Sequence, residues 1–415
     1  MSQQKPSVAI LHYTAPPVVG GVESVLGQHA RLLIQAGFPV KIIAGRGEEL
    51  DPKIPFHCIP QADSRHPQVL EVKAELDQGI VSAKFVELTE ALTSALRESL
   101  KDTRILIVHN VCSLNKNLAL TAALKNQNEY PGSPRLILWH HDLAWATLRY
   151  RPELHDGYPW NLLCSDWPGA VQVVVSKLRQ TELAELLNIP AERILVIPNG
   201  VNIGQFMKLE NATYGWMNKL ALLAAEPLLL LPVRITPRKN IELAVRVLNA
   251  LREEFPNAKL LITGPLGPHN PANLKYFERL VRLRDELDLN GAVWFLAELA
   301  AEFLSDAVIA DFYHLADALI LPSREEGFGI PLLEAGLAGI PVFCTDLPPL
   351  RDLGGQNVAY FSADADPKEV ASLLANSLKT SSTFKLRLQV KQSFTWERIF
   401  SERISPLLIA QSGVP

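Results

Sequence analysis

The chain has 415 residues, of which 48% are hydrophobic and 20% are charged, and its formal net charge is -4. This length is too great for one ordinary core and predicts two domains, each able to bury a large apolar interior. The sequence has neither a basic run nor aromatic residues interleaved with basic ones, so nucleic acid is not expected as a partner.

The chain contains four well-separated cysteines and no C-x-x-C pair: Cys58, Cys112, Cys164 and Cys344. This spacing favours a reducing compartment and argues against a disulfide scaffold or a structural zinc site. The first residues, MSQQKPSVAILHY, lack the basic and apolar regions of a signal peptide. The most apolar window, 220–233, is too short and too interrupted to span a bilayer. We therefore expect a cytoplasmic protein without a transmembrane segment.

Short apolar runs alternate with helical patterns along the whole chain. In the first half the predicted strands are 8–13, 40–45, 104–109, 135–140, 171–176 and 193–198, separated by helices such as 23–35, 85–100 and 177–187. The second half repeats the scheme at 228–233, 258–264, 292–296, 317–322, 340–345 and 358–361. Apolar strands joined by helical crossovers predict parallel sheets covered on both faces. The fold class is therefore α/β with two domains, and the break is expected in the polar stretch 206–214.

Ligands bind beyond the carboxyl ends of the strands in open α/β sheets. After the first strand, Gly20 and Gly21 precede a helix, in a pattern that is neither G-x-G-x-x-G nor a P-loop. The pair allows close backbone approach to a phosphate or a sugar, although an ordinary turn is an alternative. His109, His140 and His141 end two other strands, and the two adjacent histidines should point to opposite faces. At most one of these two is expected to face the ligand.

The first strand of the second half is followed by VRITPRKN, which places Arg234 and Lys239 at the strand end and at the next helix start. A guanidinium and a nearby ammonium are suited to a diphosphate leaving group, because its departure leaves extra negative charge on it. Solvated surface charges are the alternative.

The segment EGFGIPLLE places Glu326 and Glu334 on either side of a Gly-x-Gly turn and a short apolar helix. A strand, a glycine turn and a helix N-terminus together form an anion site, because free backbone N–H groups and the helix dipole point at the ligand. The apolar surroundings predict that Glu334 lies in a largely buried element. The alternative is that Glu326 caps the helix and Glu334 is paired internally.

The chain has one Asp-x-Asp sequence, Asp364-Ala365-Asp366, which lies beside Pro367. Its position predicts a loop and a helix cap, not a metal site.

These motifs recur in one order that resembles the retaining GT-B glycosyltransferases of family 4, and the resemblance covers nearly the whole chain. It comprises Gly20–Glu23, His141-Asp142, Ser176, Ile197–Val201, Arg234 with Lys239, Pro322-Ser323, Glu326–Glu334 and Trp396. Asn202 stands where the family often has Asp, and Asn240 where Gly often follows the Lys.

The resemblance implies two Rossmann-like domains that face each other across a cleft. An acceptor domain would span 1–206 and a nucleotide-sugar domain 207–392. A C-terminal helix at 393–415 would cross back to the first domain.

The resemblance also implies roles for individual residues. Arg234 and Lys239 would hold the diphosphate, Glu334 the ribose hydroxyls, and Glu326 the hydroxyls of the donor sugar. The backbone of Gly327, Phe328, Gly329 and Ile330 would approach sugar and phosphate. Gly20 and Gly21 would close on the diphosphate, and His141 would lie beside the transferred sugar.

The expected activity is the retaining transfer of a hexose from a GDP- or UDP-sugar to a sugar, lipid-linked or small hydroxylated acceptor. The alternatives are a nucleotide-sugar epimerase or a phosphorylase on the same scaffold, or a non-catalytic nucleotide-sugar-binding protein. No cofactor and no obligatory metal are expected, and a peripheral membrane contact is left open. Acceptor choice is expected to lie in loops at 61–79 and 150–167, the second of which carries Tyr150, Tyr158, Trp160 and Trp167.

Overall fold

A computed structural model describes residues 5–266, 271–299 and 304–410. By its internal contacts the chain divides into two units: unit 1 comprises 1–200 and 396–415, and unit 2 comprises 201–395. The division thus falls before Val201, ahead of the predicted break at 206–214, and again at Trp396. Residues 1–4 and 411–415 of the predicted first domain and C-terminal helix lie outside the described residues.

Unit 1 contains a seven-stranded sheet in the order β3-β2-β1-β4-β5-β6-β7. Every pairing in it is parallel. The strands are β1 Val8–Leu11, β2 Val40–Ala44, β3 Phe56–Cys58, β4 Ile105–His109, β5 Arg135–His140, β6 Val171–Val174 and β7 Ile194–Val196. The three-residue edge strand β3 was not predicted, because its sequence FHC is too short and too exposed to show an apolar run.

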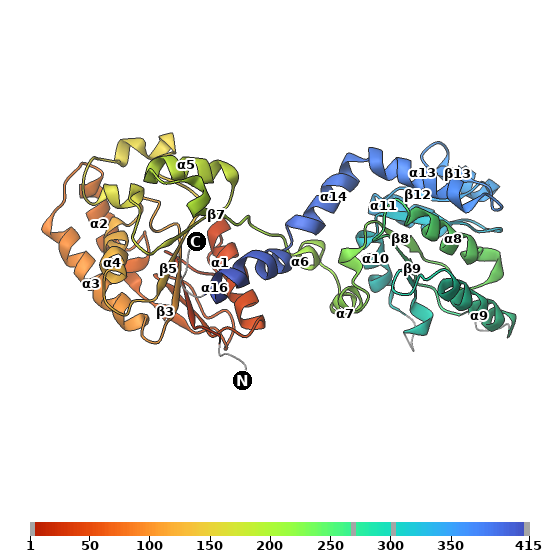
Figure 1. Ribbon diagram of the computed structural model, residues 1–415, viewed down its shortest axis with the longest axis horizontal. Coiled ribbons are helices and arrows are strands. Elements are labelled where there is room, and N and C mark those ends of the chain that lie inside the picture. Colours follow the sequence, from red (N-terminus) through yellow and green to blue (C-terminus); the bar gives the residue numbers. More distant parts are fainter. Residues whose placement is uncertain (1–4, 267–270, 300–303, 411–415) are drawn as a thin grey trace. The chain divides into compact units, whose positions relative to one another are not determined.

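Helices cover both faces of this sheet (Figure 1). They are α1 Gly21–Gln35, α2 Pro67–Leu76, α3 Ala83–Ser99, α4 Leu118–Asn128, α5 Lys177–Leu187, α15 Trp396–Ile399 and α16 Ser405–Ile409. Strand residues alternate between the faces: Val8 and Ile10 pack with α1 and with the helices after Trp396, whereas Ala9 and Leu11 pack with α2, α3 and α4. The last described helices are therefore part of the core of unit 1.

Unit 2 contains a six-stranded parallel sheet in the order β10-β9-β8-β11-β12-β13. Its strands are β8 Leu228–Leu231, β9 Lys259–Ile262, β10 Val293–Phe295, β11 Ala318–Leu321, β12 Val342–Thr345 and β13 Ala359–Phe361. Its helices are α6 Ile203–Met207, α7 Asn211–Lys219, α8 Ile241–Leu251, α9 Pro271–Glu286, α10 Asp306–Leu315, α11 Ile330–Ala338, α12 Pro348–Gly354, α13 Pro367–Thr380 and α14 Ser382–Ser393. Both units are thus Rossmann-like α/β folds, as predicted.

Two segments that were expected to be irregular are helical. The polar stretch 206–214 contains the end of α6 and the start of α7, and Leu209 within it joins the core of unit 2, as do Met217 and Leu220 just after it. The predicted loop 61–79 contains α2. In both cases the few apolar side chains that reach a core outweigh the polar character of the surrounding sequence.

A buried ion pair fastens α14 to the sheet of unit 2. Lys391 Nζ lies 2.9 Å from Asp317 Oδ2, and the two side chains are 5% and 2% exposed. Asp317 also accepts a hydrogen bond from the Leu228 backbone N–H at 2.8 Å, and Arg387 Nε lies 3.3 Å from its Oδ1. The carboxylate thus ties the amino ends of β8 and β11 to the helix that leads out of unit 2.

We expect Lys391→Met to destabilise unit 2 by about 3 kcal/mol, because removing one partner of a buried pair leaves the other charge inadequately compensated. Chemical denaturation followed by circular dichroism measures the loss. Lys385→Met, at an exposed position of the same helix, is the matched control and should leave the unfolding midpoint nearly unchanged. Equal midpoints for the two variants would contradict the role of the pair.

Candidate functional site

The carboxyl edge of the unit 1 sheet carries a row of histidines. His12 follows β1, His109 ends β4 and His141 follows β5, and these three strands are neighbours in the sheet. His12 Nδ1 lies 2.7 Å from the backbone oxygen of His109, and His109 Nδ1 lies 3.0 Å from His141 Nε2. The sheet order therefore brings the predicted site residue His141 into contact with a second histidine.

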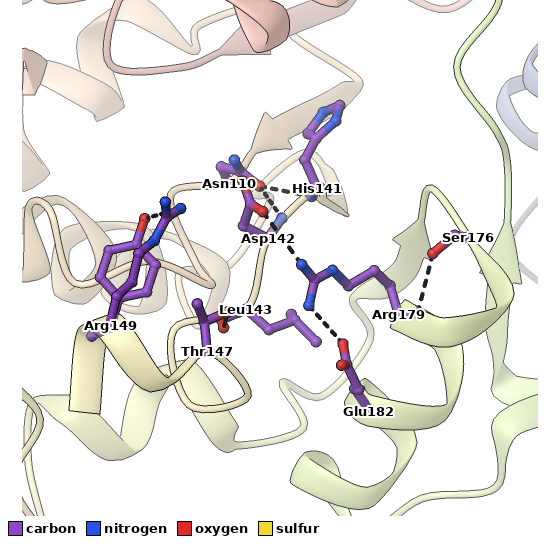
Figure 2. A network of polar contacts seen from close by, with 10 residues as sticks. Asn110, His141, Asp142, Leu143, Thr147, Arg149, Ser176, Arg179 and Glu182 are labelled. Atoms are coloured by element: carbon purple, nitrogen blue, oxygen red, sulfur yellow. Dashed lines mark hydrogen bonds and ion pairs between the residues drawn. The ribbon is translucent and has the colours of Figure 1, made fainter.

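Asn110 holds the backbone at His141 (Figure 2). Its Oδ1 accepts hydrogen bonds from the backbone N–H groups of His141 at 2.7 Å and Asp142 at 3.2 Å. Asn110 itself has φ of 58°, a left-handed conformation that asparagine tolerates better than most residues. The turn after β4 thereby fixes the turn after β5.

His140 is bound on the other side of β5. Its Nε2 lies 2.8 Å from Gln172 Oε1 on β6, and it is 3% exposed, whereas His141 is half-buried and contacts β4. Of the two adjacent histidines, His140 is therefore the one that packs inside unit 1.

Asp142 belongs to an ionic network at the same edge (Figure 2). Arg179 of α5 lies 3.5 Å from Asp142 Oδ1 and 2.7 Å from Glu182 Oε2. The backbone N–H of Arg179 donates to the side chain of Ser176, which caps α5. The predicted motif residue Ser176 thus has a structural role, which is to start the helix that carries Arg179.

Gly20 and Gly21 lie at the start of α1, Gly20 as the N-cap residue and Gly21 as the first helical residue. A Cβ on Gly20 would lie 2.0 Å from a carboxylate oxygen of Glu23, whereas one on Gly21 would meet nothing within 4 Å. The open space beside Gly21 and the unpaired N–H groups of a helix N-terminus suit an anionic ligand.

In unit 2, Lys239 and Glu326 form a contact that the sequence analysis did not anticipate. Lys239 Nζ lies 2.5 Å from Glu326 Oε1, and the two side chains are 10% and 9% exposed. The Ser323 hydroxyl donates to the same oxygen at 2.7 Å, and the Thr345 hydroxyl donates to the Ser323 backbone oxygen at 2.6 Å. The segments that follow β8 and β11 are thereby joined to each other and to the last residue of β12 at the carboxyl edge of the sheet.

Arg234 lies on the segment between β8 and Lys239 and is exposed. Its guanidinium forms no hydrogen bond or ion pair with any residue in the described ranges 5–266, 271–299 and 304–410. Its backbone is held by the neighbouring segment, since Ile235 N–H donates to the Pro265 oxygen at 3.0 Å. A Cβ on Gly264 would lie 1.9 Å from the Val233 oxygen, so this glycine permits the close approach. Sequence reasoning missed Gly264, because it matches no motif.

The turn before α11 needs its second glycine. Gly329 has φ of 112°, which side chains rarely adopt, and a Cβ there would lie 2.5 Å from Leu350. Gly327 meets nothing within 4 Å. The turn thus leaves the backbone N–H groups at 327–330 at the mouth of α11, next to the residue that contacts Lys239.

The expectation that Glu334 lies in a largely buried element is wrong. Of the residues of α11, only Leu332 and Ala335 are buried, while the side chains of Ile330 and Leu337 are 58% and 91% exposed. The nine-residue helix contacts the core through one narrow stripe, which leaves Glu334 exposed.

Glu334 accepts a hydrogen bond from the Tyr313 hydroxyl at 2.5 Å, and both residues line a cavity of about 360 Å³ between α10 and α11. Burial and this bond raise the pKa of Tyr313, which keeps it a donor. The structure therefore pairs Glu326 with Lys239 and Glu334 with Tyr313.

The two departures from the family pattern are each explained by the backbone. Asn240 has φ of 51°, a conformation that Gly and Asn adopt readily, and its side chain donates to the Ala363 oxygen at 2.9 Å. Asn202 caps α6 by accepting from the Gln205 N–H at 2.9 Å, as an aspartate also does. Asp366 caps α13, as predicted for the Asp-x-Asp sequence.

The aromatic side chains of 150–167 do not share one role. Trp160 and Trp167 are buried in the core of unit 1, whereas Tyr150 is half-buried and Tyr158 is 52% exposed. Both tryptophans therefore pack inside unit 1.

Two further properties concern the described residues as a set. No three His, Cys, Asp or Glu side chains among them are grouped so that they could hold a metal ion. None of their helices has both the length and the apolar character needed to cross a membrane.

Comparison with known proteins gives two family matches in tandem. The family model described as Glycosyltransferase Family 4 matches residues 19–205, and the one described as Glycosyl transferases group 1 matches residues 216–393. The chain belongs to the group 1 glycosyltransferases. The two matched ranges correspond closely to the parts of units 1 and 2 that carry the motifs described above.

Curated relatives include other glycosyltransferases. The serotype-specific mannosyltransferase WbdA of Escherichia coli is 30% identical over 37% of this chain, a match that spans only 17% of WbdA. Mannosylglucosylglycerate synthase of Thermotoga maritima is 25% identical over 81% of this chain and 79% of that protein. MMP alpha-(1->4)-mannosyltransferase of Mycolicibacterium hassiacum is 22% identical over 96% of this chain and 97% of its own length.

Among solved structures, a glycosyltransferase from Rickettsia africae covers 98% of this chain and 100% of its own, with 17% identity and a TM-score of 0.37. Anabaena Alr3699/HepE, solved in complex with UDP and glucose, covers the same shares with 15% identity and a TM-score of 0.37. At these TM-scores the likenesses add nothing to the topology described above.

The buried histidines of this glycosyltransferase give unit 1 a pH dependence. His29 of α1 is fully buried, and burial lowers its pKa to about 3. Its neutral form is therefore kept in the folded state while the unfolded chain takes up a proton below a pH of about 6.5. For this group the free energy of unfolding should fall by about 1.4 kcal/mol for each pH unit between about 6.5 and 3.

When the pH is lowered from 6.5 to 5, we therefore expect the free energy of unfolding of His29→Phe to fall by about 2 kcal/mol less than that of the parent protein. Denaturant titrations of both proteins at the two pH values measure the difference. His57→Gln, at an exposed position of β3, is the comparison variant and should change the pH dependence less than His29→Phe, because burial lowers the pKa of His57 to a smaller extent than that of His29. An unchanged pH dependence in His29→Phe would show that His29 does not cause the acid sensitivity.

Proposed function

We propose that this glycosyltransferase moves a hexose from a GDP- or UDP-sugar to a hydroxyl acceptor with retention of the anomeric configuration. The observation that carries the proposal is the buried contact between Lys239 and Glu326 downstream of the exposed Arg234, whose guanidinium forms no hydrogen bond or ion pair with a described residue. A fixed ammonium, an available guanidinium and a carboxylate are the groups that a sugar diphosphate needs. The relatives, which include mannosyltransferases, support sugar transfer.

In this proposal Arg234 and Lys239 bind the diphosphate as charged donors. Oε1 of Glu326 contacts Lys239 and Ser323, while its Oε2 accepts no hydrogen bond from a described residue. That oxygen is assigned to hydroxyls of the donor sugar. Backbone N–H groups of 327–330, at the mouth of α11, add donors for sugar and phosphate.

The remaining predicted residues are assigned to further groups of the nucleotide-sugar donor. Glu334 is assigned to the ribose hydroxyls, for which it exchanges or shares its bond to Tyr313. Gly20 and Gly21 are assigned to the diphosphate, and His141 to the transferred sugar. No metal ion is part of the proposal, because Arg234 and Lys239 supply the positive charge.

The chemistry proposed is a same-face substitution at the anomeric carbon. The bond from this carbon to the diphosphate oxygen breaks, and a bond to the acceptor oxygen forms on the same face. The acceptor proton passes to the departing diphosphate. Positioning and stabilisation of the leaving charge then account for the rate, and no protein side chain serves as nucleophile.

The activity is tested by incubating the full chain with GDP- and UDP-hexoses, with and without a panel of hydroxylated acceptors. Donor consumption that requires an acceptor supports the proposal. Donor isomerised without acceptor would replace it by an epimerase, and consumption that requires inorganic phosphate would replace it by a phosphorylase. Binding without turnover across the panel would favour a non-catalytic binding protein.

We expect Arg234→Gln to weaken binding of GDP or UDP by about ten- to a hundredfold, because hydrogen bonds to charged groups contribute roughly 1.5 to 3 kcal/mol. Calorimetry on the folded variant measures the affinity. Arg238→Gln, at an exposed position on the same segment, is the control and should bind as the parent does. Equal affinities of Arg234→Gln and the parent would remove Arg234 from the diphosphate site.

The stereochemical outcome is a separate prediction. An α-linked nucleotide sugar should give an α-linked product, because the leaving diphosphate remains on the face at which the acceptor arrives. NMR of the first-formed product reads the anomeric coupling directly. A β-linked first product would overturn the same-face mechanism while leaving the donor site intact.

A further inference from the structure

Unit 1 contains buried histidines to which the proposed chemistry assigns no role. His29 of α1, His109 of β4 and His141 form a continuous group with Trp139: the ring centroids of His29 and His109 are 5.3 Å apart, as are those of His109 and His141. His109 is fully buried, and its one ring contact to a polar atom among described residues is the 3.0 Å contact of its Nδ1 with His141 Nε2.

The contact between His109 Nδ1 and His141 Nε2 holds a single proton. Burial, with His29 and His141 nearby, holds the pKa of His109 well below its usual value. Burial likewise lowers the pKa of His141 to about 3. Both imidazoles are therefore neutral near pH 7, so one nitrogen of the contact donates and the other accepts.

The surroundings of His109 decide which ring donates. Its Nε2 is buried and has no hydrogen-bond partner among the described residues. If the proton were there, an N–H group would be left unsatisfied in an aromatic environment, which is rarer in proteins than an unsatisfied acceptor. The favoured arrangement places the proton on Nδ1 of His109, which donates to Nε2 of His141.

His141 then carries its own proton on Nδ1. This nitrogen makes no hydrogen bond to a described residue and is not one of the buried atoms that lack a partner among the described residues. It can therefore present an N–H donor to a ligand. The backbone of His141 is fixed at the same time by Asn110, the residue that follows His109.

We propose that His109 is a positioning residue that holds His141 in its Nδ1–H form, as a donor to a hydroxyl oxygen of the transferred sugar. The inference rests on the proposed function for its ligand, but not for the contact itself. His109 touches no substrate and acts only through His141. In this role His141 is a neutral donor and takes no proton from the acceptor, in agreement with transfer of that proton to the leaving diphosphate.

Two variants separate positioning from packing. His109→Leu keeps an apolar side chain and removes the donor, whereas His109→Asn carries an N–H at the same number of bonds from Cβ as Nδ1 of histidine. We expect His109→Leu to lower kcat by about ten- to a hundredfold with little change in the donor KM. His109→Asn should restore most of this loss. Loss of the same size in both variants would reduce His109 to a packing role and overturn the proposal.

The protonated nitrogen is read without any substrate. Long-range ¹H–¹⁵N NMR of histidine-labelled, ligand-free protein should show His141 protonated at Nδ1, with the signal assigned by its absence in His141→Leu. This single form should be lost in His109→Leu and kept in His140→Gln, a control whose amide nitrogen matches Nε2 of His140 toward Gln172. His141 protonated at Nε2 in the parent protein would overturn the proposal, even if transferase activity is present.

The two experiments also distinguish this inference from the proposed function. If no acceptor supports turnover, the proposed function fails, while the NMR measurement still decides how His109 holds His141. If transfer occurs but His141 is protonated at Nε2, only the positioning role of His109 fails. Should His109→Leu not fold, the parent spectrum and His109→Asn give the same decision.

Discussion

The ion pair between Lys239 and Glu326 is the contact around which the edge of unit 2 is organised. Both side chains are about nine-tenths removed from solvent, so each charge loses hydration that the other must replace. Ser323 and Thr345 extend the pair into hydrogen bonds that join the segments after β8 and β11 to the end of β12. Because β8, β11 and β12 are consecutive in the sheet, the two loops are held in one arrangement before any ligand arrives.

Such a pair is a poor way to gain stability, since well-packed apolar residues often do as well or better. Its presence at the carboxyl edge of the sheet is better explained by function. Lys239 is a cation fixed by a carboxylate, and Arg234, whose guanidinium forms no hydrogen bond or ion pair with a described residue, precedes it on the same segment. The two cations can therefore bind a second anion. The proposed donor supplies this anion as its diphosphate, and the free oxygen of Glu326 remains available for sugar hydroxyls.

The buried histidines of unit 1 are neutral groups, although the ion pairs of Arg179 lie at the same edge. Burial lowers the pKa of His29, His109, His140 and His141, so these four side chains serve as neutral donors and acceptors. Neutral imidazoles orient hydroxyl groups without competing for the acceptor proton. In the proposed chemistry the charge then develops on the diphosphate, where the cations of unit 2 are assigned, and the proton follows it. The two sets of residues therefore divide the work between charge stabilisation and orientation.

Much of this arrangement follows from local sequence patterns, and the exceptions have physical causes. Apolar runs predicted most strands, because parallel strands are covered on both faces, but the short exposed β3 carries no such signal. The roles assigned to Lys239 and Glu326 stay predictions, and their direct contact was not predicted, because it depends on β8 and β11 being neighbours. The exposure of Glu334 was missed because an apolar helix sequence does not reveal how narrow its contact with the core is.

Asn240 shows the converse: its left-handed φ of 51° explains why asparagine can stand where glycine is usual, since that position is defined by backbone conformation. Arg234 and Lys239 beside it are defined by charge, so a change there would alter chemistry where a change from glycine to asparagine does not.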